Sequence, residues 1–232
     1  MIWFIVAGQQ ANSSNGGLWL FEEVGPGELA FNSRLAIPNV PSNQTVLSAS
    51  FNEDASLLFA SHTAVTYAGR SWNLAKFDKE TGGVVWTDYI SSADEGVRQS
   101  VWQGSKIAIA KKASSGNDDI LALLSASEDG TLTLLDRLFT GGNPEASGLG
   151  WIGDKILVSG VNPARTVLVR VEEDDTLTEL DSQPFGTTIG GMGQSPDNDL
   201  VAVLDETSGN LKIWDGSGDT IDFVAEIASN ST

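Results

Sequence analysis

The chain has 232 residues, with 13 Lys and Arg against 31 Asp and Glu, so its formal net charge is −18. It has no Cys and a single His, which excludes a disulfide framework, a thiolate zinc site, a cysteine nucleophile and a zinc site built on several histidines. The strong acidity argues against nucleic acid as a partner, because binding a phosphate backbone needs clustered Lys and Arg. The charge favours solubility and cationic partners instead.

The apolar start of the chain, residues 1–8, is too short for a signal peptide or a membrane helix, and no basic segment precedes it. We therefore expect no membrane as a partner. The sequence leaves the location open between the cytoplasm and a virus particle.

Short apolar runs separated by Gly, Asn, Asp, Ser and Pro follow one another along the whole chain, which is typical of strands rather than helices. They recur in units of roughly 45 residues, approximately 1–43, 44–96, 97–146, 147–187 and 188–232. An all-β repeat of this length indicates a propeller. We predict a single all-β domain over residues 1–232, a five-bladed β-propeller of four-stranded antiparallel blades.

The first unit is expected to lack its innermost strand. Its apolar runs, 3–7, 18–21 and 28–37, match the second, third and outermost strands of the other units, whose innermost strands we expect at 45–51, 97–102, 148–152 and 188–193. The unpaired backbone groups of the first blade would then need water, a chain terminus or another chain as a partner.

The third strands are expected to end at equivalent positions 43 to 56 residues apart, at Phe21, Phe77, Ala126, Val171 and Trp214. Recurrence of aromatic residues at one position of a repeat indicates packing between blades.

Two stretches carry a resemblance that can be named. Residues 195–215, with Ser195-Pro196-Asp197 followed by Leu211-Lys212-Ile213-Trp214-Asp215, resemble a WD-repeat blade, and residues 74–86 are similar to a quinoprotein-type propeller repeat. The resemblance implies the propeller architecture.

The acidic residues fall mostly in two kinds of turn, the innermost-to-second and the third-to-outermost, which lie on one face of a propeller. We therefore expect most of the negative charge on that face. The loops of the opposite face are longer and closer to neutral, and long loops on a rigid scaffold usually carry recognition.

No catalytic constellation is recognisable. His62 lacks the nucleophile elbow expected of a Ser–His–Asp triad, the acids are not placed as a pair at the ends of innermost strands, as a glycosidase would require, and the acidic turns do not match a calcium loop. We predict no catalytic residues, no metal site and no cofactor.

The predicted binding residues lie in or beside the long loops. Tyr67, Arg70 and Trp72 form an aromatic and basic group of the type found at protein interfaces. The basic residues Arg98, Lys111 and Lys112 are added to this set.

These observations favour a protein that is not an enzyme: an interaction or structural module of a larger assembly, such as a virus particle. Its partners would be other proteins of that assembly, one of which could complete the first blade, and the chain could form an oligomer. The alternative is a carbohydrate-binding or glycoside-hydrolase-like propeller, in which loop Asn, Ser and Trp residues contact the sugar.

Overall fold

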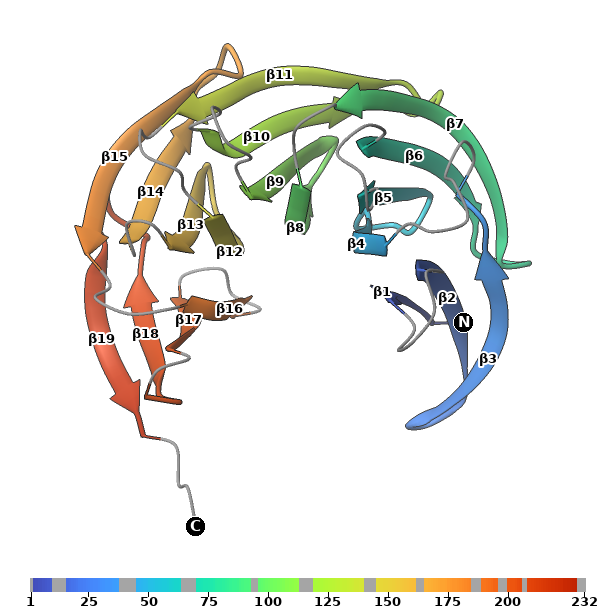
Figure 1. Ribbon diagram of the computed structural model, residues 1–232, viewed down its shortest axis with the longest axis horizontal. Coiled ribbons are helices and arrows are strands. Elements are labelled where there is room, and N and C mark those ends of the chain that lie inside the picture. The colour runs from blue at the N-terminus through green and yellow to red at the C-terminus, as the bar shows by residue number, and fades with distance from the viewer. Residues whose placement is uncertain are drawn as a thin grey trace. The chain divides into compact units, whose positions relative to one another are not determined.

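The computed structural model describes residues 2–9, 16–37, 45–63, 70–92, 96–112, 119–139, 145–161, 165–184, 189–195, 200–205 and 208–228. The regular elements in this part of the chain are strands, labelled β1 to β19 in Figure 1. No helix among the described residues is long and apolar enough to span a membrane.

The strands form five consecutive antiparallel blades, which confirms the predicted five-bladed β-propeller. Among the described residues, the first blade has three strands in the order β1-β2-β3 and no innermost strand, as the sequence predicted. Its strands are β1 (Trp3–Gln9), β2 (Gly16–Gly25) and β3 (Glu28–Leu35).

The other four blades have four strands each, from the innermost to the outermost in chain order. The second blade contains β4 (Thr45–Phe51), β5 (Leu57–Thr63), β6 (Arg70–Asp78) and β7 (Gly83–Ser92). The third contains β8 (Gly96–Gln103), β9 (Lys106–Lys112), β10 (Asp119–Ala126) and β11 (Leu132–Phe139). The fourth contains β12 (Glu145–Ile152), β13 (Lys155–Val161), β14 (Arg165–Val171) and β15 (Leu177–Pro184). The fifth contains β16 (Ile189–Gln194), β17 (Leu200–Asp205), β18 (Leu211–Asp215) and β19 (Asp222–Ile227).

The chain divides into two compact units. The first unit comprises residues 1–106 and 125–133, and the second comprises residues 107–124 and 134–232. The boundary falls within the third blade, and each unit is described by itself.

In the first unit, the first two blades pack through apolar side chains. Leu18 of β2 is buried in a cluster with Val46 and Ala60 of the second blade. Nearer the turns, the ring of Trp3 meets Phe77 edge-on at a centroid distance of 5.6 Å. Alternate residues of a strand face opposite sides of its sheet, so one face of the first blade is covered and the other is not.

In the second unit, the fourth and fifth blades share a second apolar cluster. Leu157 and Leu168 of the fourth blade pack against Val201 and Val203 of the fifth, and all four are fully buried. Burial of such side chains is the main stabilising contribution to a β-propeller of this size.

The register corrects one predicted equivalence. In the second, third and fourth blades, the backbone N–H of Phe77, Ala126 or Val171 donates to the carbonyl of the residue just before the second strand. In the first blade, the N–H of Glu23 makes the equivalent hydrogen bond. Phe21 therefore lies two residues before the position occupied by Phe77. The strand-end pattern was misaligned there because β2 continues to Gly25, further than its apolar run indicated.

Consecutive blades are also joined by an aspartate on the outermost strand. The carboxylate accepts a hydrogen bond from the backbone N–H at or just before the start of the next outermost strand, in three successive blades. The pairs are Asp88 with Leu132 at 2.7 Å, Asp136 with Leu177 at 2.7 Å and Asp181 with Ile221 at 2.9 Å. The fourth to fifth blade contact thus combines an apolar cluster with a charge-assisted hydrogen bond.

Replacement of Asp181 with alanine should lower the free energy of unfolding by about 1–2 kcal/mol, because a backbone N–H loses a charged acceptor that is partly screened by solvent. The hydrogen bond from Ile221 is the main cause that lowers the pKa of Asp181. A lowered pKa in the folded state means that the contribution is complete above the unfolded value of about 3.9 and is lost as the pH falls through the folded value. Urea unfolding of both proteins at neutral and acidic pH would measure this. Glu179→Ala, an exposed change on the same strand, is the control and should have little effect at either pH.

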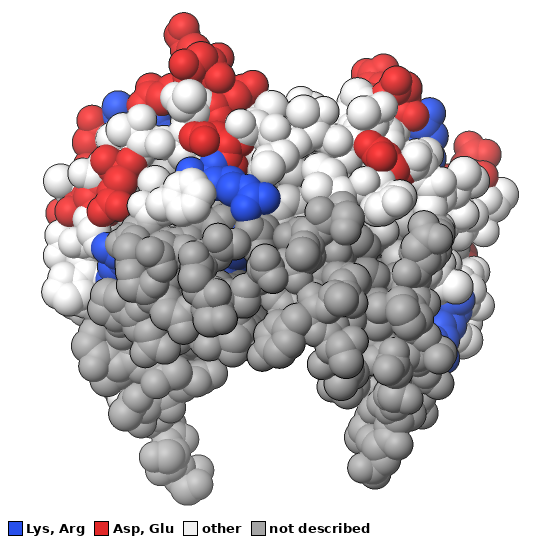
Figure 2. Space-filling view, turned by 45° about the horizontal axis from the view of Figure 1, so that its top comes forward, with Lys and Arg blue, Asp and Glu red and all other residues white. Residues whose placement is uncertain are grey.

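Acidic side chains form dense groups on the described surface in Figure 2. Several of them have a structural role, since each accepts hydrogen bonds from a Ser or Thr side chain and from a backbone N–H of its own turn, and these bonds hold its pKa below the ordinary value. Such carboxylates are Asp54, Asp78, Asp129, Asp174 and Asp215. The concentration of acids in these turns is therefore partly explained by turn geometry.

Candidate functional site

The sixth position of the second strand is either an ionisable residue or glycine in all five blades. In the first four blades this strand has seven residues, and in the fifth it has six. The sixth residue is ionisable in three blades, as His62, Lys111 and Asp205, and is glycine in the other two. This end of the strand leads into the loop to the third strand, and loops on a rigid scaffold often carry binding and catalytic residues.

Two of these ionisable residues are buried. Lys111 is 0% exposed and Asp205 is 4% exposed. A buried charge is costly unless it is paired or has a functional partner, so buried ionisable residues at a loop end are candidates for a functional site. The described part of His62 is its backbone, which pairs in register with Val46 and Ser71.

Asp205 has an ionic partner within its own blade. The ammonium Nζ of Lys212 in β18 lies 3.5 Å from Oδ2 of Asp205, and the Lys212 side chain is 20% exposed. The Asp205 carboxylate is thus almost completely buried, whereas the Lys212 side chain keeps limited contact with water. Lys212 stands opposite Val203 in the β17–β18 register, so its side chain extends along the sheet to reach Asp205.

The turn after β17 fixes Asp205 from several directions. Its N–H donates to the carbonyl of Asn210, and its own carbonyl accepts from Gly209, whose φ is +70°. The backbone N–H of Ser208 donates to Oδ1 of Asp205 at 3.3 Å. The residue also pairs with Ile189 at the start of the innermost strand β16. Backbone and side chain are therefore both positioned, which is what a catalytic or binding carboxylate needs.

A second polar group lies between the innermost strands β4 and β8 of the first unit. The hydroxyl of Ser100 is 2.8 Å from that of Ser48 and 2.7 Å from that of Ser50, and the indole N–H of Trp102 donates to Ser50. Ser61 stands opposite Ser48 in the β4–β5 register, and its buried hydroxyl has no hydrogen-bond partner among the described residues. The hydroxyls of Ser48, Ser50 and Ser100 bond to one another and so stabilise the contact between β4 and β8.

The residues predicted to bind a partner are placed differently from the sequence-based expectation. Trp72, expected to be exposed in a long loop, lies inside β6 and is 1% exposed, because β6 begins at Arg70. Lys111 is a buried residue of β9. Arg98 and Lys112 lie in strands β8 and β9, and Tyr67 lies outside the described residues.

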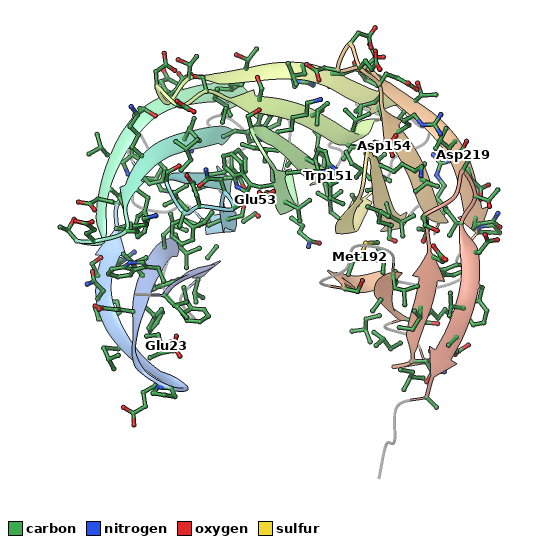
Figure 3. The ribbon with its side chains drawn as sticks, turned by 180° about the vertical axis from the view of Figure 1, so that it is seen from behind. Glu23, Glu53, Trp151, Asp154, Met192 and Asp219 are labelled. Atoms are coloured by element: carbon green, nitrogen blue, oxygen red, sulfur yellow. The ribbon has the colours of Figure 1, made fainter. Side chains whose placement is uncertain are left out.

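The charged side chains in the described turns of the second unit form ion pairs and hydrogen bonds. Asp154 and Asp219, labelled in Figure 3, flank the guanidinium of Arg170, which forms ion pairs with both. Lys155 donates to the carbonyl of Ser217 at 2.7 Å. Within the described ranges no group of three or more His, Cys, Asp or Glu side chains is arranged to hold a metal ion.

Asp205 and Lys212 were missed as a pair by sequence reasoning. By sequence, Asp205 is one of several acidic residues in the near-neutral loops of the propeller face opposite the acidic turns. Its position could have been recognised by aligning the second strands and noting that an apolar alternation, Val201 and Val203, ends in a carboxylate. The pairing with Lys212 depends on the sheet register and has no sequence signal.

The fold and these sites define the class of protein as a β-propeller. No model of a known protein family matches the chain, and no curated protein matches it significantly. Solved structures that match it are propellers of several types, among them the β-propeller domain of Myceliophteria thermophila Cps50, with 13% identity and a TM-score of 0.65 over 92% of this chain and 66% of that one. The propeller is supported by these likenesses, whereas the WD-repeat type is not singled out.

Other similar structures are named as lactonases. One is a candidate 6-phosphogluconolactonase of Bacteroides uniformis, with 15% identity and a TM-score of 0.78 over 99% of this chain and 68% of that one. Another is the periplasmic gluconolactonase of Pseudomonas aeruginosa, with 14% identity and a TM-score of 0.74 over 97% and 67%.

These likenesses contradict the predicted interaction or structural module, the virus-particle assignment and the prediction that the chain is not an enzyme. The sequence carries no recognisable catalytic motif, but the absence of a motif does not exclude an enzyme. The sugar-directed alternative agrees better with the comparisons.

Proposed function

We propose that the protein hydrolyses the ring ester of a sugar lactone. The observation that carries this proposal is the match of nearly the whole chain to two propellers named as lactonases, at TM-scores of 0.78 and 0.74. The buried Asp205 and its partner Lys212 supply the two chemical groups that such a reaction requires. The resemblance of residues 195–215 and 74–86 to WD-repeat and quinoprotein-type blades is retained as a proposal about repeat type only.

Lactone hydrolysis requires a base to activate water and a positive group near the carbonyl oxygen. In the proposed reaction, the Asp205 carboxylate accepts a proton from water as the water oxygen bonds to the carbonyl carbon. The ammonium of Lys212 stabilises the negative charge that develops on the carbonyl oxygen. The ring C–O bond then breaks, and the proton passes to the departing ring oxygen, which becomes a hydroxyl of the open-chain sugar acid.

The charge of the chain favours a neutral substrate. A net charge of −18 repels a phosphorylated sugar and would slow its association. We therefore propose a neutral sugar lactone, such as glucono-1,5-lactone, rather than its 6-phosphate.

The test is an assay of acid release from glucono-1,5-lactone by the purified chain, with a pH indicator in weak buffer, against the spontaneous rate. We expect saturable hydrolysis well above that rate, and slower hydrolysis of the 6-phosphate at low ionic strength. Hydrolysis at the spontaneous rate for both lactones would refute the proposal. Faster hydrolysis of the phosphorylated lactone would refute the choice of a neutral substrate.

A further inference from the structure

The outward face of the first blade carries many exposed apolar residues. They are Ile2, Phe4, Val6, Trp19, Phe21, Leu29 and Phe31, called here the first-blade face. Glu23 and Arg34 lie on the same side of the sheet, and the Arg34 guanidinium lies 6.0 Å from the centroid of the Trp19 ring. Phe4, Phe21 and Phe31 stand opposite one another across all three strands of the sheet. Phe4 is 43% exposed and Phe31 is 58% exposed.

The same positions are buried in every other blade. Phe4 and Val6 are the second and fourth residues of the second strand, and Val6 is 49% exposed. Their counterparts are 0% exposed, namely Leu58 and Ala60, Ile107 and Ile109, Ile156 and Val158, and Val201 and Val203. The first-blade face therefore has the residue pattern of one half of a blade–blade contact.

The fifth blade carries the opposite half. The side of its sheet away from the fourth blade presents Leu200, Ala202, Leu204, Leu211, Ile213 and Ile227, called here the last-blade face. Leu204, the fifth residue of its strand, is 39% exposed, whereas the counterparts Ser61, Ala110 and Ser159 are at most 1% exposed. Leucine is also larger and more apolar than these counterparts, so this face is better suited to burial than to solvent.

We propose that a second copy of this chain covers these faces, with the last-blade face of one copy packed on the first-blade face of the next. Val201 and Val203 are the second and fourth residues of β17 in the fifth blade. They pack against Leu157 of the fourth blade. The proposed contact repeats this arrangement between chains. Each copy carries one face of each kind, so the contact is head-to-tail.

Two further observations favour more propeller blades as the occupant. The chain matches only 68% and 67% of the two lactonase-named structures, so part of each of those structures lies outside the match. The first blade also lacks an innermost strand, which leaves an edge of β1 for a neighbouring chain. The net charge of −18 on each copy opposes association, so salt should strengthen it by screening the repulsion.

The experiment measures molar mass by sedimentation and light scattering over a wide range of protein and salt concentrations. The wild type should exceed the monomer mass of 24.5 kDa increasingly at high protein concentration and high salt. Phe4→Glu and Leu204→Glu should each remain monomeric. Every copy of a given variant has the same face disrupted by a charge, and the contact needs one intact face of each kind. Mixed in equal amounts, they should form a dimer through the two intact faces and no larger species.

Val85→Glu is the matched control, since Val85 is 65% exposed on β7 outside both faces, and it should associate as the wild type does. Circular dichroism would confirm that each variant is folded. A monomeric wild type under all conditions would overturn the proposal, and would indicate that the fifth blade closes on the first within one chain or that another protein covers them. Dimers that survive in Leu204→Glu alone would indicate like-to-like contact and would also overturn it. Neither outcome depends on lactone hydrolysis.

Discussion

Replacement of Asp205 with asparagine is expected to lower kcat/KM for sugar-lactone hydrolysis by about 10²- to 10⁴-fold, the usual contribution of a general base. Asparagine has nearly the same shape and can still accept the hydrogen bond from Ser208, but it cannot take a proton from water. Initial rates of lactone hydrolysis by the two proteins at neutral pH give this comparison.

The variant also leaves Lys212 without its anionic partner, and removal of one member of a buried ion pair is destabilising. Urea unfolding must therefore show that Asp205→Asn is folded under the assay conditions. Asp181→Asn is the control, since it changes an aspartate that joins two blades by a hydrogen bond to Ile221, and its kcat/KM should match the wild type. A folded Asp205→Asn protein with wild-type kcat/KM would show that the Asp205–Lys212 pair is structural.

The Leu168→Ala variant should lose about 3–5 kcal/mol of unfolding free energy, the upper part of the range for leucine in a core. Leu168 is 0% exposed and packs in the cluster of Leu157, Val201 and Val203. Its Cδ1 also lies 3.3 Å from where a side chain at Gly216 would begin, so β14 and the end of β18 meet closely here. The loss is a large part of the total stability of an ordinary domain.

Equilibrium unfolding in urea measures this effect as a shift of the midpoint at constant slope. The matched control is Val85→Ala, at a valine that is 65% exposed and lies outside both apolar faces, and its shift should be much smaller. A loss below about 1 kcal/mol for Leu168→Ala would mean that the contact between the fourth and fifth blades collapses around the cavity or contributes little to folding.

The strand pattern of the chain was predictable because it is local. Alternating apolar residues and Gly- or Asp-rich turns identify a strand whatever its neighbours are. The expected innermost strand at 45–51 agrees with β4, and that at 148–152 lies within β12. The three-stranded first blade followed from the same count of apolar runs.

The placement of individual side chains was not predictable to the same degree. Trp72 was expected to be exposed in a long loop beside Tyr67 and Arg70, yet β6 begins at Arg70 and places the indole inside the blade. Phe21 was aligned with Phe77 by the ends of apolar runs, whereas the backbone hydrogen bonds align Glu23 with Phe77. Register depends on which strands pair, and pairing depends on residues distant in sequence.

By itself, then, the sequence determined the all-β character, the five repeats, the missing strand and the acidic turns, since each arises from neighbouring residues. The tertiary structure decided that Asp205 meets Lys212, that Asp181 reaches Ile221 and that Phe4 and Leu204 are left uncovered. These relations join residues on different strands or concern which side of a sheet is covered. Only the folded arrangement of the strands sets them.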